Sequence, residues 1–353
     1  MQTLHIFNPE HDIALASNLT NFTAPHAGRQ LRNDLGFLPA LWAEEGDVVL
    51  VESVEGAERA YKRLRSKLGR ARCLFVDKSQ LPRLDLQHVS PWGWDPALCA
   101  QLRRWGVSSQ LLPATDHLET VRQLSHRRTS AHLLPLLQME GTVGQAFECT
   151  KTEQVAALRE QYGQIVVKAP WSSSGRGVRF DENAAWVAHV IAHQGSVMVE
   201  PYYNKVKDFG MEFTATRQGL RYEGLSLFQT KNGAYTGNVL ATEQVKRVSI
   251  SRYVSLDLLD TVRDRILSTL SLGSYQGPFG VDMMLVSSTP EATTPAASCS
   301  LHPCVEINLR RTMGHVALDI ERLYNPTQDD DIRGVMRVIF NGNNYQLKID
   351  KQT

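Results

Sequence analysis

The sequence predicts an α/β domain built on an open sheet, followed by an α+β region. The runs "DVVLVES" (47–53) and "ARCLFVD" (71–77) are short and almost continuously apolar, as is typical of parallel strands buried on both faces. The stretches "GRQLRNDLGFLPALWAEEG" (28–46) and "EGAERAYKRLRSKLG" (55–69) have the apolar spacing of helices. Strands that alternate with helices predict a doubly wound open sheet over about 1–112.

The second half of the sequence predicts a different architecture. A helix is expected over 115–138, with a capping box formed by Asp116 and Glu119. From about residue 146, predicted strands and helices interleave without a strict strand–helix–strand rhythm, which favours α+β. The stretch "SSTPEATTPAASCSLHP" (287–303) indicates a flexible polar insertion between two strands. The predicted domains are 1–112, 113–203 and 204–353.

Composition narrows the classes of partner. The chain of 353 residues is 42% hydrophobic and has a formal net charge of +1, so no overall field favours nucleic acid or an anionic membrane. The sequence has no signal-peptide pattern and no apolar run of the ~18–20 residues that a membrane helix needs. Its five cysteines are sparse and odd in number, as expected in a reducing compartment. We therefore expect a cytoplasmic protein with no nucleic-acid or membrane partner.

The stretch "VVKAPWSSSGRGVRF" (166–180) indicates a phosphate-binding element. Lys168 ends a predicted strand, and a loop rich in serine and glycine follows it. The lysine would supply a fixed positive charge, and the loop would supply backbone N–H groups that approach a phosphate without side-chain clash. It is not a P-loop, because there the lysine follows the glycines. The alternative is a hairpin turn with a surface lysine.

Two later stretches place acidic and basic side chains on predicted strands. Asp282 lies among apolar residues in "GVDMML" (280–285), and "VEINLRRTMGH" contains Glu306, Asn308 and Arg310 at every second position. Such spacing directs all three to one face of a strand, which is costly unless they bind something. Oxygen ligands of this type suit Mg²⁺ together with nucleotide phosphates, and the arginine suits a transferring phosphoryl group. The alternative is a solvated strand face.

Taken in this order, the lysine and glycine loop, the strand aspartate and the E-x-N-x-R pattern resemble the ATP-grasp superfamily over about 115–320. The stretch "EINLRRTMGH" is most similar to peptide-ligase or carboxylate–amine ligase members. The resemblance implies two α+β subdomains that clasp ATP, behind an N-terminal α/β domain. It also implies a reaction in which a substrate carboxylate attacks the γ-phosphorus of ATP, giving ADP and an acylphosphate that an amine then attacks.

The resemblance further implies roles for individual residues. It assigns ATP contacts to Arg128, Lys168, Ser173, Ser174, Gly175, Gly177, Glu200 and Asp208. Arg127 is the alternative to Arg128. It assigns Asp282, Glu306 and Asn308 as ligands of Mg²⁺, with two ions bridged by Glu306 and Mn²⁺ as a substitute. Arg310 and Lys231 are expected near the transferred phosphoryl group, although a lysine before Asn-Gly is also ordinary in a hairpin turn.

Substrate-binding residues are expected after the first predicted strand, "TLHIFN" (3–8). In an open α/β sheet, ligands bind beyond the carboxyl ends of the strands, where Asn8, Glu10 and His11 lie. Arg29, in "TNFTAPHAGRQL", is positioned to pair with a carboxylate. The alternatives are a polar turn with Asp12 as a helix cap, and an arginine on a helix surface.

The expected partners are therefore a small-molecule carboxylate and an amine, and a homodimer is compatible with the sequence. Two other functions are compatible with the same motifs. One is kinase-type phosphoryl transfer from ATP to an acceptor other than a carboxylate. The other is a nucleotide-binding regulator without catalysis, although intact Lys168, Asp282, Glu306 and Asn308 argue against a decayed site.

Overall fold

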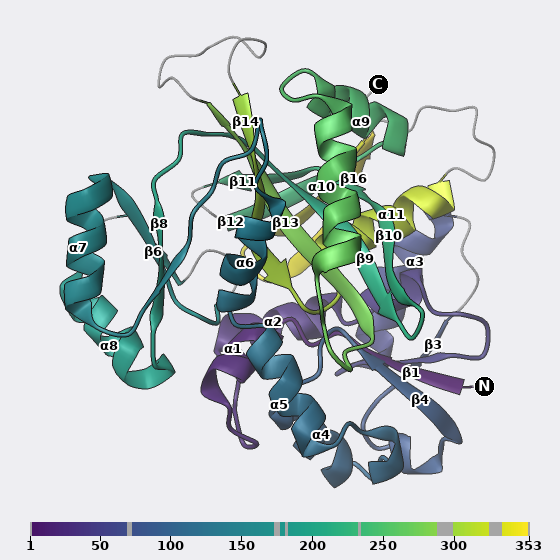
Figure 1. The fold of residues 1–353 in the computed structure, drawn as a ribbon. Coiled ribbons are helices and arrows are strands. Elements are labelled where there is room, and N and C mark those ends of the chain that lie inside the picture. The colour runs from purple at the N-terminus through teal and green to yellow at the C-terminus, as the bar shows by residue number, and fades with distance from the viewer. Residues whose placement is uncertain are drawn as a thin grey trace. The chain divides into compact units, whose positions relative to one another are not determined.

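The computed structural model (Figure 1) describes residues 2–68, 73–172, 177–180, 183–231, 234–287, 299–324 and 334–351. Contacts between residues divide the chain into two units. Unit 1 comprises Met1–Arg122, Thr236–Thr242 and Arg310–Thr353, and unit 2 comprises Gln123–Tyr235 and Glu243–Leu309. These units are not the consecutive segments 1–112, 113–203 and 204–353 that the sequence predicts, because two later stretches of the chain return to unit 1.

Unit 1 contains two sheets and the helices around them. Its strands are β1 (Gln2–Ile6), β2 (Val48–Leu50), β3 (Leu74–Val76), β4 (Leu86–Pro91), most of β12 (Ala234–Leu240), β15 (Gly334–Phe340) and β16 (Tyr345–Lys351). Its helices are α1 (His11–Ser17), α2 (His26–Leu35), α3 (Val54–Leu68), α4 (Pro96–Arg104), nearly all of α5 (Thr115–Leu124) and α11 (Met313–Tyr324). Short 3-10 helices lie at Leu38–Leu41, Leu81–Arg83 and Ser109–Leu111.

The first sheet of unit 1 is parallel, in the order β3-β2-β1-β4, which confirms the predicted open α/β sheet. Its short strands are buried on both faces, as their continuous apolar runs predict. Val48 points into one hydrophobic core and its neighbour Val49 into the other. Strands β12, β15 and β16 pair antiparallel in the second sheet.

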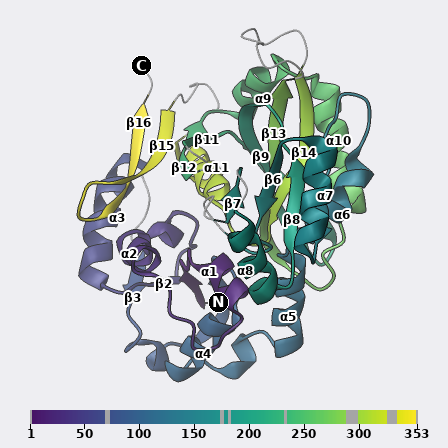
Figure 2. The same ribbon diagram turned by 90° about the vertical axis from the view of Figure 1, so that its left-hand side faces the viewer.

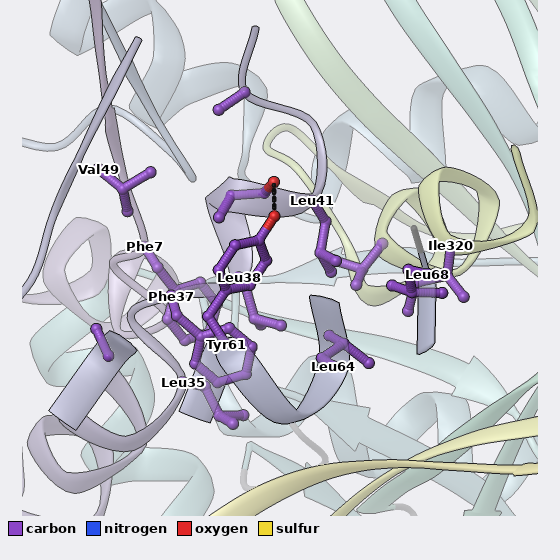
Figure 3. Packing of buried hydrophobic residues seen from close by; sticks show 14 of the residues in the cluster. Phe7, Leu35, Phe37, Leu38, Leu41, Val49, Tyr61, Leu64, Leu68 and Ile320 are labelled. Carbon is purple, nitrogen blue, oxygen red and sulfur yellow. Dashed lines mark hydrogen bonds between the residues drawn. The ribbon is translucent and has the colours of Figure 1, made fainter. Parts of the chain in front are cut away.

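The larger core of unit 1 explains why the C-terminal residues belong to it. Phe7, Phe37 and Tyr61 pack with other buried side chains, and the Tyr61 hydroxyl donates to the backbone carbonyl of Ala40 at 3.3 Å (Figure 3). Ile320 of α11 joins the same cluster and is fully buried. Burial of such a side chain contributes about 1.5–3 kcal/mol, so α11 is held to the N-terminal residues by apolar contact.

Unit 2 also contains two sheets. Its strands are β5 (Phe147–Cys149), β6 (Ile165–Lys168), β7 (Val178–Arg179), β8 (Val197–Pro201), β9 (Lys205–Thr216), β10 (Gly219–Ser226), β11 (Phe228–Lys231), β13 (Gly277–Ser287) and β14 (Cys299–Asn308). Its helices are α6 (Arg128–Leu133), α7 (Thr152–Tyr162), α8 (Ala184–Gln194), α9 (Glu243–Ser251) and α10 (Leu256–Thr269), with a 3-10 helix at Leu134–Leu137.

The sheets of unit 2 are antiparallel and packed on helices, as the predicted α+β class requires. The sheet β10-β9-β13-β14 buries Phe213 and Phe279, whose rings stack with centroids 5.1 Å apart. Helices α9 and α10 pack on β10 (Figure 1). In the sheet β5-β8-β6-β7, α7 and α8 pack on the central strands over a separate apolar core (Figure 2).

The helix predicted over 115–138 is wrong, because the structure breaks it. Helix α5 ends at Leu124 and α6 begins at Arg128, since the backbone N–H of Arg127 donates to the carbonyl of Pro170 instead of continuing a helix. The predicted capping box is also wrong. Helix α5 begins at Thr115, so Asp116 lies in its first turn and accepts from the N–H of His117.

The predicted insertion over 287–303 is too long. Strand β13 includes Ser287, and β14 begins at Cys299. Leu301 and His302 are fully buried, and Leu301 forms a parallel bridge with Thr142. Residues 288–298 lie outside the described residues. Among the helices of the described ranges, none combines the length and apolarity needed to cross a membrane.

Candidate active site

Lys168 and Glu200 form a buried ion pair between the two central strands of a unit 2 sheet. The Lys168 Nζ lies 2.6 Å from the Glu200 Oε1, and both side chains are more than nine-tenths buried. An ammonium has three N–H donors, so two remain beyond the bond to Glu200. Both charges lie near Cys304, whose pKa is raised to about 12, mainly by burial. The ion pair thus fixes the position of the Lys168 ammonium, whose remaining donors suit a phosphate.

Asp282 and Glu306 face each other across β13 and β14. They are register partners, so their side chains leave the sheet on one face at neighbouring positions. Asn308 follows on the same face, and its Nδ2 donates to the Asp282 Oδ2 at 3.0 Å. The three predicted metal ligands are thus brought together by strand pairing, while their role as ligands stays a prediction.

A glycine keeps space open beside this acidic group. Gly210 of β9 is the register partner of Asp282 on the other side. A Cβ built on Gly210 would lie 3.4 Å from the Asp282 Oδ1 and 3.7 Å from the Glu212 Oε1. Glu212 is therefore a further carboxylate beside the group, which sequence reasoning missed. The alternation of apolar and polar residues along "GMEF" was the signal in the sequence that could have indicated it.

The donor set fits a magnesium ion that arrives with a nucleotide. Within the described residues, no group of three or more His, Cys, Asp or Glu side chains is arranged to hold a metal ion alone. Asp282, Glu306 and Asn308 offer oxygen ligands, and Mg²⁺ usually takes one or two carboxylates with substrate phosphates completing its shell. The site thus suits a metal–phosphate complex better than an ion held by protein alone.

Arg127 occupies the position next to the acidic group. Its Nη2 donates to the Glu306 Oε2 at 2.8 Å, and its Nη1 donates to the Ser172 Oγ at 2.8 Å and to the Ala169 carbonyl at 2.5 Å. Arg128, the residue that the sequence favours, instead pairs with Glu148 at 2.7 Å. Because the two arginines are adjacent, sequence alone could not decide which one faces Glu306.

The glycine loop is described only at its ends. Ser173, Ser174 and Gly175 lie outside the described residues. At Gly177 a Cβ would come within 2.4 Å of the Ser172 side chain, so a glycine is required where the two ends of the loop approach. The carbonyl of Gly177 also accepts from the N–H of Ala169 at 2.7 Å.

Asp208 and Lys231 lie on strands rather than in turns. Asp208, in β9, accepts from the Lys205 Nζ at 2.6 Å and from the Thr230 Oγ1 at 2.7 Å. Lys231 is the last residue of β11, not a loop residue, and its side chain lies outside the described part of the chain. Their predicted roles at the ribose and at the phosphoryl group stay predictions.

The structure does not place Arg310 on the strand face where the sequence predicts it. Strand β14 ends at Asn308, so Arg310 does not share its face with Glu306. Its guanidinium makes a bidentate pair with Asp12 in unit 1, at 3.1 Å from Nε to Oδ1 and 2.8 Å from Nη2 to Oδ2. Asp12 therefore does not cap α1, which begins at His11. The catalytic role predicted for Arg310 stays a prediction.

Three of the four predicted substrate residues of unit 1, Asn8, Glu10 and Arg29, line one cavity of about 80 Å³. Its polar lining comprises Asn8, Glu10, Thr23, Arg29, Arg32, Asp95 and Gln101. Asn8 fixes the chain around it, since its Nδ2 donates to the Gly93 carbonyl at 2.8 Å and to the Asp95 Oδ2 at 3.1 Å. His11 does not line the cavity. It is fully buried, with its Nδ1 3.7 Å from the Asp95 Oδ2.

His302 is a further buried polar residue, and the sequence assigned it no functional role. Both of its ring nitrogens lack a hydrogen-bond partner among the described residues, and its ring makes an edge contact with Tyr203. Burial first, and then the charge of Lys168, lower its pKa to about 3, so the imidazole is neutral. The signal was its spacing of four residues before Glu306 on the same strand, which the Ser-, Thr- and Pro-rich composition of 287–303 concealed.

Comparison with solved structures identifies the fold. No family model matches the sequence, and no curated protein matches it either. The structure is similar to N5-carboxyaminoimidazole synthetase from Staphylococcus aureus, complexed with ADP, with 13% identity, a TM-score of 0.53 and coverage of 96% of this chain and 82% of that one. It is also similar to biotin carboxylase from Campylobacter jejuni, complexed with β-γ-ATP, with 12% identity, a TM-score of 0.53 and coverage of 96% and 75%.

Both of these proteins are ATP-grasp proteins, and both similarities extend over nearly the whole of this chain. The chain therefore has the ATP-grasp fold with a preceding α/β domain, as its motifs predict. At identities of 12–13% the similarity defines the fold.

Proposed function

We propose that the protein is an ATP-dependent ligase that binds magnesium–ATP in unit 2 and joins a carboxylate to an amine. One observation supports the proposal most directly. Asp282 and Glu306 are paired across two strands, and Arg127 links Glu306 to Ser172, the residue before the glycine loop. The acidic side chains, an arginine suited to a phosphate and the serine that precedes the loop thus belong to one hydrogen-bonded group.

Each side chain has a role in this proposal. Lys168 and Arg127 bind and orient the phosphates, with Arg128 as a more exposed contact. Asp282, Glu306 and Asn308 hold the magnesium, which supplies charge neutralisation at the phosphate oxygens when bound. Glu200 fixes the Lys168 ammonium and lies on the strand expected beside the adenine. These residues position charge, and no nucleophilic side chain is required.

The proposed reaction has two balanced steps. A carboxylate oxygen of the first substrate attacks the γ-phosphorus, and the bond to the bridging oxygen breaks, giving ADP and an acylphosphate. The amine of the second substrate then attacks the acyl carbon. Inorganic phosphate leaves, the amine nitrogen loses a proton, and a C–N bond remains.

The test is ADP release from magnesium–ATP in the presence of pooled amino acids, dipeptides and small carboxylates. We expect release that requires both a carboxylate and an amine, and a loss of about 10²–10³-fold in Glu306→Gln, the range for removing one preorganised charge-stabilising group. Glu223→Gln is the matched control, because Glu223 is a sheet glutamate of the same unit that pairs with Arg221.

The outcomes separate the candidate reactions. Release that needs a single acceptor without an amine indicates kinase-type transfer and contradicts the ligase. ATP binding without release in any pool indicates a nucleotide-binding regulator. Equal losses in Glu306→Gln and Glu223→Gln mean that the effect comes from the sheet and not from the proposed site.

A further inference from the structure

The cavity in unit 1 combines both charges within a small volume. Glu10 and Asp95 supply carboxylates, and Arg29 and Arg32 supply guanidinium groups. If each non-hydrogen atom needs about the volume that one water molecule needs, a cavity of 80 Å³ holds about five to eight such atoms. The cavity is therefore matched to a small ligand that is itself charged at both ends.

The acidic side of the cavity has an unsatisfied acceptor. Glu10 is 8% exposed, and its Oε2 has no hydrogen-bond partner among the described residues. Its Oε1 accepts from the Arg32 Nη1 at 2.6 Å, and Arg32 also pairs with Glu52 at 3.0 Å. Arg32 thus holds one oxygen of Glu10, while the other is buried without a partner among the described residues. Burial raises the pKa of Glu10, so a cationic donor beside the Oε2 would stabilise its charged form.

The basic side has an available donor. Arg29 precedes Arg32 by three residues on α2, so both side chains lie on the same side of that helix. Unlike that of Arg32, the side chain of Arg29 makes no hydrogen bond or ion pair with any residue that the structure describes. It is exposed at the wall of the cavity, where its planar fork of donors suits a carboxylate.

From these observations we infer that the cavity binds a free α-amino acid with a small side chain. Its ammonium group donates to the Glu10 Oε2, and its carboxylate accepts from Arg29. Only the statement that this amino acid is one of the two substrates depends on the proposed ligase function. Binding itself requires residues of unit 1 alone, so it is measured without ATP.

The experiment is a thermal-shift screen of the full chain with the twenty L-amino acids, followed by calorimetric titration of the strongest one. That amino acid is compared with its amide, which lacks the carboxylate, and its N-acetyl form, which lacks the ammonium. We expect each blocked form to bind about 10- to 100-fold more weakly, the effect of losing a hydrogen bond to a charged group. Absence of a shift with all twenty, or equal binding of a blocked form, overturns the inference.

Two variants with matched controls locate the site. Glu10→Gln and Arg29→Gln are expected to weaken binding about 10- to 100-fold. Glu52→Gln removes the other carboxylate from Arg32, and Arg83→Gln changes another exposed arginine of unit 1, so both should bind as the wild type does. If Glu10→Gln fails to fold, Arg29→Gln still decides, because the Arg29 side chain is exposed and makes no hydrogen bond or ion pair with the described residues. Unchanged binding in Arg29→Gln overturns the inference.

The failures of the two proposals are distinguishable. Amino-acid binding without ATP binding leaves the cavity assignment standing and contradicts the ligase. ATP turnover with the variants unimpaired leaves the ligase standing and contradicts the cavity assignment.

Discussion

The parallel sheet of unit 1 and the sheet β10-β9-β13-β14 of unit 2 present polar groups in different ways. In unit 1 the strands are short and buried on both faces, so Asn8, Glu10 and Asp95 appear only beyond strand ends. In unit 2 the strands are long and antiparallel, so Asp282 and Glu306 stand on a strand face, side by side.

The difference has a consequence for mutations. Groups beyond strand ends also build the loops that position them, as Asn8 and Asp95 do by bonding to each other. Groups on a strand face leave the backbone ladder intact when they are changed. Substitutions at the first kind of site should therefore reduce stability together with binding, and substitutions at the second kind should reduce binding alone. The Lys168–Glu200 pair, buried within a second sheet of unit 2, is the expected exception.

That exception gives the largest expected effect. Lys168→Met leaves the Glu200 carboxylate buried without a counter-charge, which should destabilise the protein by about 3–5 kcal/mol. The double variant Lys168→Met, Glu200→Leu removes both charges and should recover most of that loss, yet still fail to bind ATP. Urea unfolding followed by circular dichroism measures the stabilities. A double variant no more stable than the single one contradicts the account.

A smaller loss is expected at the end of the parallel sheet. In Gly93→Ala, the new Cβ would lie 2.7 Å from ring atoms of the fully buried His11, which should cost about 1–3 kcal/mol. Gly56→Ala is the control, since this glycine lies in α3, where alanine is the better helix former. If both variants have the same free energy of unfolding in urea, the packing around His11 is looser than described.

Two helix caps provide a finer comparison. Asp95 caps α4 at the cavity and also accepts from Asn8, whereas Ser255 caps α10 with an exposed hydrogen bond. We expect Asp95→Ala to lose about 1–2 kcal/mol and Ser255→Ala about 0.5–1 kcal/mol. Thermal unfolding of both variants measures the difference. A larger loss in Ser255→Ala contradicts the structural role of the cavity residues.

The smallest effect is expected at a surface ion pair of unit 2. Hydrogen bonds from Arg247 lower the pKa of Asp260 below its ordinary value. Because the pKa is lowered in the folded state, the pair contributes its full stabilising free energy at pH values above the unfolded pKa, near pH 4. This stabilisation is lost as the pH falls through the pKa of the folded state.

The stability difference between the wild type and Asp260→Asn should therefore be at most about 1 kcal/mol at pH 7, and it should shrink toward pH 3. Urea titrations at the two pH values measure it. A stability difference that grows toward pH 3 would contradict the lowered pKa of Asp260.

The sequence predicted the strands and helices whose burial follows from their local composition. The apolar runs of β2 and β3 indicated a parallel sheet because strands covered on both faces have few polar residues. The lysine before the glycine loop, and the acids at every second position, could be found for a similar reason, since local spacing sets the face of a strand. The three metal-ligand candidates follow from that spacing together with strand pairing.

What could not be predicted depends on contacts distant in sequence. Arg310 continues the alternation of Glu306 and Asn308, but its position depends on Asp12, 298 residues earlier. The choice between Arg127 and Arg128 depends on a backbone hydrogen bond to Pro170, which breaks the predicted helix. His302 was concealed because Ser, Thr and Pro around it suggested a loop, whereas pairing with β13 makes this part a buried strand.

We propose that a strand-face site in unit 2 binds magnesium–ATP, and calorimetric titration of ATP is the most direct test. The wild type and Asp282→Asn are titrated with Mg²⁺ present and with the metal removed by a chelator. Under this proposal, the wild type binds ATP less tightly without Mg²⁺, and Asp282→Asn binds ATP weakly in both conditions. Absence of ATP binding by the folded wild type, or equal binding by Asp282→Asn with Mg²⁺, would contradict it.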